Sequence, residues 1–152
     1  MIYRYKATLP QHKNFLRIYE ARANTTLYAL HLFLQNNLSF SPDQQVFFKT
    51  YNASGKQVSE YGLFDMGFGA MDQIQLETIQ AKGQQELHYV FDIFKGRYLT
   101  LQFDGEVEEV MRRVYPCTIQ ERGTNPDQFR DEQLSSWIDF EERDVIQEEE
   151  GE

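Results

Sequence analysis

The side chains that could act as a nucleophile or a general base are few in this sequence, and they are widely spaced. A thiol attacks only when a neighbouring base or cation lowers its pKa, and Cys117 is the one cysteine. His31 or His88, together with Asp92, would be its partners in a hydrolase, but no local signature of a cysteine hydrolase surrounds it. We therefore interpret Cys117 as a packing residue beside Pro116 and assign no catalytic residue. We favour a protein that is not an enzyme, with a hydrolase built on Cys117 or Asp92 as the weaker hypothesis.

The histidines and glycines give no sign of a metal or nucleotide site. Metal ligands usually recur at short local spacings, and His12, His31 and His88 match none of these. The glycines of residues 62–69 fit neither the phosphate-loop pattern nor the dinucleotide fingerprint. We expect no metal and no cofactor, and we interpret His31 as a hydrogen-bonded histidine at the edge of the core.

Four polar residues remain as a candidate site cluster, namely Arg17, His31, Asp92 and Glu121. If the fold builds a site, these side chains should converge in one cleft. Asp92 lies on the wet side of an expected strand, where it could pair with Arg17 or Arg97 or accept hydrogen bonds from turn amides. We prefer this pairing to general acid or base catalysis.

Aromatic residues in a glycine-rich loop indicate a binding surface instead. Residues 61–70 contain three glycines together with Tyr61, Phe64 and Phe68, and a loop this apolar should pack against something. Trp137 lies on a short amphipathic helix that we expect near residues 131–138. The sequence thus favours a non-enzymatic protein-interaction module, with a protein partner or a second copy as its target.

The charge is distributed unevenly, which raises an alternative function. The net charge is -9, but residues 1–103 carry 10 Lys or Arg against 8 Asp or Glu, whereas residues 104–152 carry 5 against 16. A basic first hairpin could contact nucleic acid while the acidic tail competes for the same face. The alternative is therefore a nucleic-acid-binding accessory protein, although scattered solvated charges explain the pattern more simply.

Length and composition bound the class of protein. A chain of 152 residues fits one domain, and 41% hydrophobic residues supply a core without disulfides, which a single cysteine could not form. The first residues lack the apolar stretch of a signal peptide, and no apolar run approaches the roughly 20 residues of a membrane-spanning helix. We expect a cytoplasmic protein with no membrane contact.

The hydrophobic pattern predicts the elements that would position these residues. Alternation predicts strands over residues 3–9 and 16–21, joined by a loop at 11–14, and over 87–93 and 98–103, joined by a Lys95-Gly96 turn. Helical spacing predicts a helix over residues 27–36 after cap residues at 24–26.

The remaining segments are harder to assign. We expect strands over residues 46–51 and 74–79, with a turn at 52–55. The apolar residues of 107–114 fit a helix, and residues 104–105 could form a turn between strands. Residues 141–152 are too charged to be buried and should be disordered.

Together these elements predict an α+β fold, in which a β-grasp-like mixed sheet has one main helix, an added β-hairpin and a short C-terminal helix. Residues 1–140 would form the single domain, and residues 141–152 an acidic tail.

Four blocks in order carry a family resemblance. They are Phe15-Leu16-Arg17-Ile18, Thr26-Leu27 with Leu30-His31, the hairpin around Asp92, and Tyr115-Pro116-Cys117 through Glu121, Gly123 and Pro126. Over roughly residues 3–130, this order resembles the Ri-plasmid open-reading-frame-three-like family, found on plasmids and beside insertion elements. The resemblance implies a β-grasp variant with an added hairpin and, as the alternative to a helix, a strand that continues over residues 107–114. It also implies a plasmid or mobile-element setting and no known activity. Residues 94–97 depart from the glycine, acids and tryptophan of the family pattern.

Overall fold

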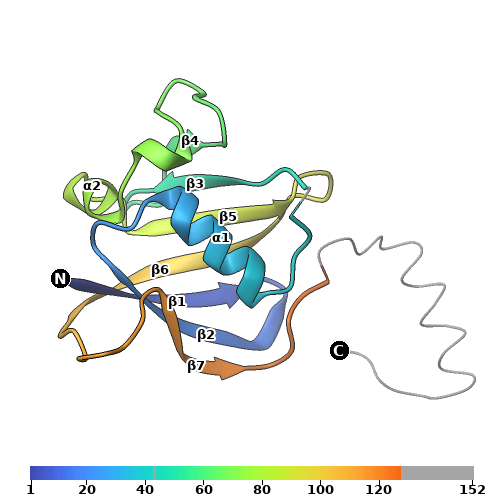
Figure 1. The fold of residues 1–152 in the computed structure, drawn as a ribbon. Coiled ribbons are helices and arrows are strands. Elements are labelled where there is room, and N and C mark those ends of the chain that lie inside the picture. Colours follow the sequence, from blue (N-terminus) through green and yellow to red (C-terminus); the bar gives the residue numbers. More distant parts are fainter. Residues whose placement is uncertain (43, 128–152) are drawn as a thin grey trace, which may run out of the picture.

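The computed structural model describes residues 1–42 and 44–127, which form one sheet of seven strands with helices packed beside it (Figure 1). The strands lie in the order β4-β3-β5-β6-β1-β2-β7, and each of the six pairings is antiparallel. The strands are β1 (Ile2–Leu9), β2 (His12–Arg22), β3 (Phe47–Tyr51), β4 (Gln57–Tyr61), β5 (Glu86–Asp92), β6 (Arg97–Val107) and β7 (Cys117–Arg122). The helices are α1 (Leu27–Asn37), the short 3-10 helix η1 (Met71–Gln73) and α2 (Leu76–Ala81). The chain is a sheet-dominated α+β protein.

Two hairpins form the centre of the sheet, and both were expected from the alternation of apolar residues. Tyr5 faces Tyr19 across β1 and β2, and Leu87 faces Leu101 across β5 and β6. All four side chains are buried on one side of the sheet, because successive residues of a strand point to opposite faces. The predicted hairpins are confirmed, although β2 begins at His12, so the first turn is shorter than predicted.

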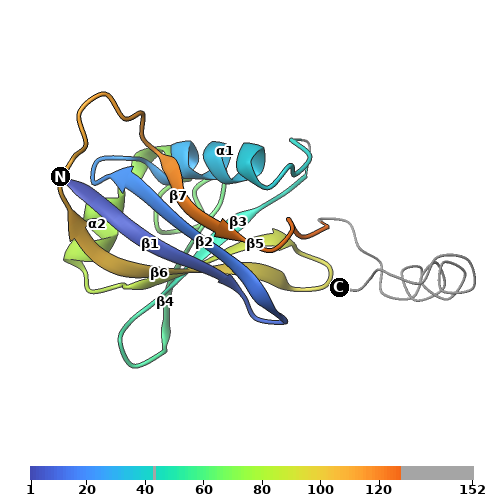
Figure 2. The same cartoon turned by 90° about the horizontal axis from the view of Figure 1, so that it is seen from below.

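Helix α1 covers one face of this sheet (Figures 1 and 2). Its first turn is capped by Thr26, whose hydroxyl accepts a hydrogen bond from the backbone N–H of Ala29 at 3.1 Å. Leu27, Leu30 and Leu34 recur at helical spacing and are buried against the sheet. The predicted helix is confirmed, and burial of its apolar side sets which face of the sheet becomes the core.

Residues 74–79 form no strand, which corrects the prediction. The chain makes one isolated bridge between Gln75 and Thr26 and then turns into α2. Leu76 and Ile79 are both buried because their spacing of three places them on the same side of a helix. In a segment this short, the apolar positions fit both the two-residue repeat of a strand and the helical repeat of about 3.6 residues.

Strands β4 and β7 were not predicted from the sequence, because they carry few apolar residues. In β4, the inward-facing Ser59 is hydrogen-bonded to the hydroxyl of Thr50 on β3, so the core accepts a polar residue there. Most residues of β7 are exposed, and this strand depends on its pairing with β2. Neither strand shows the alternation by which strands are recognised.

The sheet is antiparallel rather than mixed, which corrects a second expectation. Both β5 and β1 pair antiparallel with β6, so β5 and β1 run in the same direction. They would form a parallel pair if they were neighbours, but the β5–β6 hairpin places β6 between them. The added hairpin thus removes the parallel pairing that a mixed sheet requires.

The structure also shows which conformation residues 104–114 adopt, which the sequence left ambiguous. Strand β6 continues through residues 104–105 to Val107, so there is no turn at that point, and residues 108–114 form neither helix nor strand. The expected helix at 131–138 and the expected tail at 141–152 lie outside the described residues. Among the helices of residues 1–42 and 44–127, none has the length and apolar composition that crossing a bilayer requires.

Candidate functional site

The structure brings together two of the four residues of the candidate cluster. Arg17 on β2 faces Glu121 on β7 in the strand register, and its Nε lies 3.7 Å from a carboxylate oxygen of Glu121. The other two have different partners: His31 on α1 bonds to Tyr89 on β5, and Asp92 at the end of β5 bonds to Arg97 at the start of β6.

Arg17 is a buried anchor for the chain that follows β7. Only 2% of its surface is exposed, and its guanidinium lies 4.3 Å from the centre of the Phe15 ring. Its terminal nitrogens donate hydrogen bonds to the carbonyl oxygens of Arg122 and Gly123, at 2.7 and 3.0 Å, and to the side-chain oxygen of Asn125 at 2.9 Å. A planar guanidinium with several N–H groups can bond to all three of these oxygens at once, so we assign Arg17 a structural role.

His31 is held inside the core. Its Nδ1 lies 2.8 Å from the hydroxyl oxygen of Tyr89, and both residues are buried. Burial lowers the pKa of His31 because a charged ring would lose its hydration. The expectation of a hydrogen-bonded histidine at this position is confirmed.

Asp92 closes the β5–β6 turn. One carboxylate oxygen accepts a hydrogen bond from Arg97 Nε at 2.8 Å, and the other accepts one from the backbone N–H of Lys95 at 3.2 Å. The expectation of a pair with an arginine and a bond to a turn amide is confirmed, with Arg97 as the arginine.

Other reactive groups do not assemble in the described part of the chain. Burial raises the pKa of the Cys117 thiol, which keeps it in the less nucleophilic protonated form. Within residues 1–42 and 44–127, no three His, Cys, Asp or Glu side chains gather in a way that could hold a metal ion.

The aromatic loop differs in detail from the expectation. Tyr61 is buried, with 2% of its surface exposed, and its ring packs edge-on against Phe68 at 6.2 Å between centres. Phe64 is 81% exposed and Phe68 is 50% exposed, so these two do lie at the surface. Trp137 lies outside the described residues.

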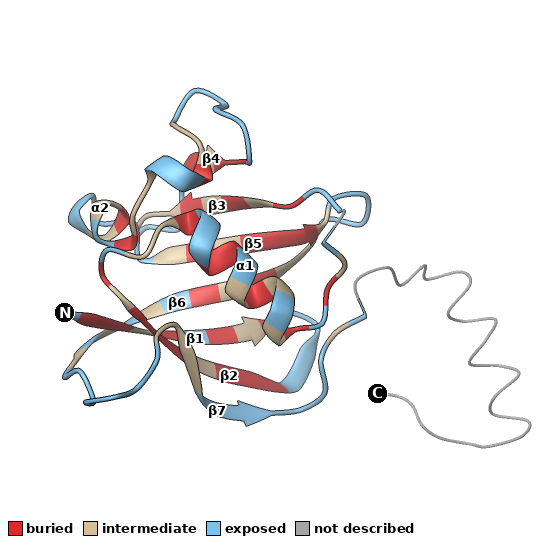
Figure 3. Ribbon diagram, viewed as in Figure 1, coloured by how far each residue is buried: buried red, intermediate tan, exposed pale blue. Residues whose placement is uncertain are grey.

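Two further apolar side chains of this loop, outside the expected set of Tyr61, Phe64 and Phe68, extend this surface. Leu63 is 43% exposed and Met66 is 46% exposed. We refer to residues 62–70 as the apolar loop; it projects from the end of β4 beyond the sheet (Figure 1), and Figure 3 shows most of it exposed. The run of apolar residues between glycines is the sequence signal that marks the whole set.

Internal hydrogen bonds fix the shape of the apolar loop. A carboxylate oxygen of Asp65 accepts hydrogen bonds from the backbone N–H groups of Gly67 and Gly69, at 2.8 and 3.0 Å. These bonds hold the pKa of Asp65 below its ordinary value, because they favour the ionised carboxylate. The backbone N–H of Met71 donates to the carbonyl oxygen of Gly62 at 3.0 Å and closes the base of the loop. The apolar side chains are therefore presented by an ordered loop.

Strand β4 lies directly before the apolar loop and ends the sheet. Its strand neighbour among the described residues is β3, so the other edge of β4 pairs with no described strand. Val58 on β4 is 40% exposed. An exposed sheet edge next to an apolar surface is an arrangement that binds extended chains.

Fold and surface together define a sheet-dominated α+β domain with a helix on one face and a projecting apolar loop. No family model matches the sequence, and a search of curated proteins gives no match. Among solved structures, the chain is similar to MM3350, a protein of unknown function from Methanosarcina mazei Go1. The TM-score is 0.78 at 13% sequence identity, and the similarity covers 97% of this chain and 84% of that chain. At this identity the likeness establishes a shared fold.

Proposed function

We propose that this chain is a non-enzymatic protein-interaction module that binds an extended segment of another protein at the edge of β4 and the apolar loop. The observation that carries the proposal is the exposure of Phe64, Phe68 and Met66 on a loop whose shape is already fixed by Asp65. Exposed apolar side chains lose contact with water when a partner covers them, which favours association.

The ordered state of the loop strengthens this proposal. A mobile loop would lose conformational entropy on binding, whereas the bonds to Asp65 have already restricted this one. The edge of β4 that pairs with no described strand offers backbone donors and acceptors to a partner strand. Such a strand could then place its own apolar side chains against Phe64 and Phe68.

Selection from a phage-displayed random-peptide library on the purified protein tests the proposal. We expect enrichment of peptides rich in aliphatic and aromatic residues, and a loss of binding of about tenfold or more in Phe64→Ser. Phe94→Ser is the matched control, because Phe94 is 99% exposed on the β5–β6 turn. The absence of enriched peptides, or equal losses in the two variants, would contradict the proposal.

Sedimentation of the purified protein distinguishes a second copy from another partner. If the protein dimerises as its concentration rises and Phe64→Ser abolishes the dimer, then the partner is the same chain. If both proteins remain monomeric while the peptides bind, then the partner is a different chain.

Nucleic-acid binding by the first hairpin has less support. Arg4 is paired with Glu20 at 2.7 Å and Arg22 with Glu109 at 2.7 Å, so these cations are already neutralised. Arg17 is buried. Phosphate contacts require accessible cations, and three of the basic residues of the hairpin are therefore poorly placed for them.

The cellular location and the family relation of the module belong to the same proposal. We place the module in the cytoplasm and relate it to the plasmid open-reading-frame-three-like family and its β-grasp variant. Contacts between the blocks that carry the resemblance support this relation: Arg17 of the first block bonds to Gly123 of the last, and His31 of the second bonds to Tyr89 in the hairpin.

A further inference from the structure

Three segments from distant parts of the sequence meet at one end of the sheet and enclose a cleft. They are the β1–β2 turn with the start of β2, the β5–β6 turn, and residues 123–127 after β7. Two adjoining cavities of about 150 and about 450 Å³ lie between them. Both cavities are lined by Leu9, Gln11, His12, Arg97 and Pro126, so we treat them as one cleft. Its size is that of a small-molecule site.

The cleft is lined by basic side chains. His12, Lys13, Lys95 and Arg97 all contribute to its walls, and Asp127 is the one acidic residue among the described lining residues. The backbone oxygen of Asp127 accepts a hydrogen bond from Arg97 at 2.6 Å. A concave surface lined by positive charges raises the local concentration of anions.

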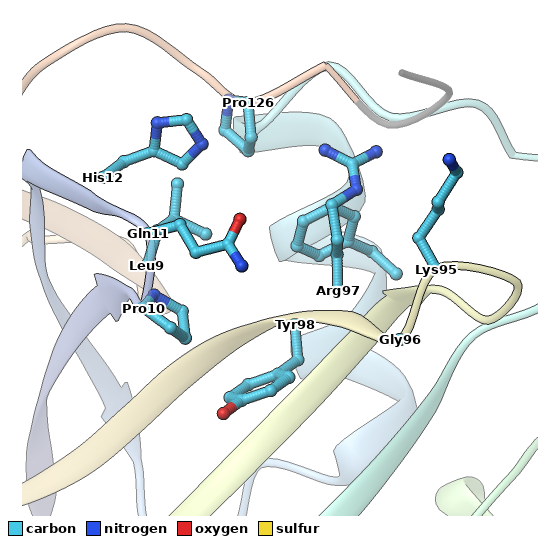
Figure 4. A pocket seen from close by; sticks show the side chains of 10 residues that line it. Leu9, Pro10, Gln11, His12, Lys95, Gly96, Arg97, Tyr98 and Pro126 are labelled. Carbon is cyan, nitrogen blue, oxygen red and sulfur yellow. The ribbon is translucent and has the colours of Figure 1, made fainter. Parts of the chain in front are cut away.

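The cations of the cleft are not all neutralised by the protein. Arg97 is paired with Asp92, whereas Lys13 and Lys95 have exposed side chains and no ion pair within residues 1–42 and 44–127. Figure 4 shows Gln11 and His12 on one side of the cavity, and Arg97 and Lys95 on the other. Donors on both sides of one space can bind the same anionic group.

The smaller cavity adds an apolar wall. Leu9, Pro10 and Phe91 line it, and the Arg97 guanidinium lies 5.2 Å from the centre of the Phe91 ring. A ligand that reaches this wall removes its own apolar end from water, while its charged end remains among the cations. The cleft is therefore suited to a molecule with an anionic end and a ring or short apolar end.

We propose that this cleft binds a small organic phosphate, with the phosphate group beside Arg97, which lines both cavities, between Lys95 of the smaller cavity and Lys13 of the larger one. The organic group would lie against Leu9, Pro10 and Phe91 of the smaller cavity. Phosphate fits better than a carboxylate because its two negative charges and several acceptor oxygens match cations on both walls. Gln11 can donate and accept, so its amide would orient the polar part of the organic group.

Calorimetric titration of the full-length protein tests this site, with phenyl phosphate, inorganic phosphate and phenol as probes. We expect phenyl phosphate to bind about threefold or more tightly than inorganic phosphate, and phenol not to bind, because both ends of the ligand contribute. Equal binding of inorganic phosphate and phenyl phosphate would overturn the apolar half of the proposal. Absence of binding by every phosphate probe would overturn all of it.

Charge variants locate the site. The double variant Lys13→Gln with Lys95→Gln should weaken phenyl phosphate binding about tenfold or more. Lys56→Gln, on the exposed β3–β4 turn, is the matched control and should leave it unchanged. Equal affinities in the double variant and the control would overturn the assignment. A single-stranded oligonucleotide that binds more tightly than phenyl phosphate, with the same dependence on Lys13 and Lys95, would replace the small ligand by nucleic acid.

Discussion

Glu20 is a carboxylate buried on β2, and its oxygens lie 2.7 Å from Arg4 and 3.3 Å from Arg113. Thr50 and Ser59 are buried on neighbouring strands and hydrogen-bonded to each other. Burying a polar group is unfavourable unless a partner replaces its water, so each of these side chains is explained by its partner. At the scale of the residue, partners within the fold therefore satisfy these buried polar groups, and the candidate sites draw on exposed side chains.

His31 predicts how stability depends on pH. Its pKa in the folded protein is below the ordinary value of 6.5, so the unfolded chain takes up a proton at a higher pH than the native protein does. The free energy of unfolding should therefore fall as the pH drops from about 7 through 6.5 toward the lower pKa of the folded state. Urea unfolding between about pH 7 and pH 5 measures this fall.

The variant His31→Gln should show a shallower fall, because glutamine does not titrate. A residual slope is expected from His88, whose pKa is also lowered by burial. His12→Gln, at an exposed position, is the control for replacing an imidazole by an amide. Identical slopes in wild type and His31→Gln would show that burial of this ring does not govern the dependence.

At the scale of the element, the chain that leaves β7 passes very close to the backbone at the start of β2. Gly123 follows β7 with a φ of +83°, and a Cβ at this position would lie 2.8 Å from the backbone oxygen of Asn14. A left-handed φ favours glycine, and the close approach excludes any side chain. The glycine lets the chain turn against β2, where its carbonyl oxygen accepts the hydrogen bond from Arg17.

Gly123→Ala should therefore destabilise the protein more than Gly55→Ala does. Gly55 has the same φ of +83°, but a Cβ there meets no atom within 4 Å. The backbone strain is common to both variants, so their difference reports the clash, which we expect to be about 2 kcal/mol. Urea unfolding of the two variants measures it, and equal losses would mean that the chain near Asn14 moves aside without cost.

At the scale of the whole molecule, the two proposed surfaces use different elements. The apolar loop and the edge of β4 form one, and the cleft between the β1–β2 turn, the β5–β6 turn and residues 123–127 forms the other. They share no residue, and the sheet connects them as a packed unit.

We therefore expect the two binding activities to be independent. Phe64→Ser should weaken peptide binding and leave phenyl phosphate binding unchanged, and the Lys13→Gln with Lys95→Gln variant should do the reverse. Combining all three substitutions should reproduce both losses without further change. Calorimetry with each ligand, in the presence and absence of the other, measures any coupling, and an affinity altered by the second ligand would reveal that the surfaces communicate.

Local features were the ones that could be predicted from the sequence. The two central hairpins follow from alternation and from turn residues, and α1 follows from its cap and its helical spacing, because these signals act between neighbours in the chain. The environments of His31 and Asp92 were also anticipated, since each follows from the side of the element on which the residue lies. The exposure of Phe64 and Phe68 was expected from their loop.

The sequence by itself determined which segments form the central strands, which segment forms the main helix, and which side of each is apolar. Tertiary structure alone decided that β6 lies between β5 and β1, that the polar strand β7 joins the sheet, and that Tyr61 is buried. It also brought Lys13 and Lys95 to one cleft, although they are far apart in the chain. The physical reason is that strand order and cleft formation depend on contacts between distant segments, whose free energy is set by packing and leaves no periodic trace in the sequence.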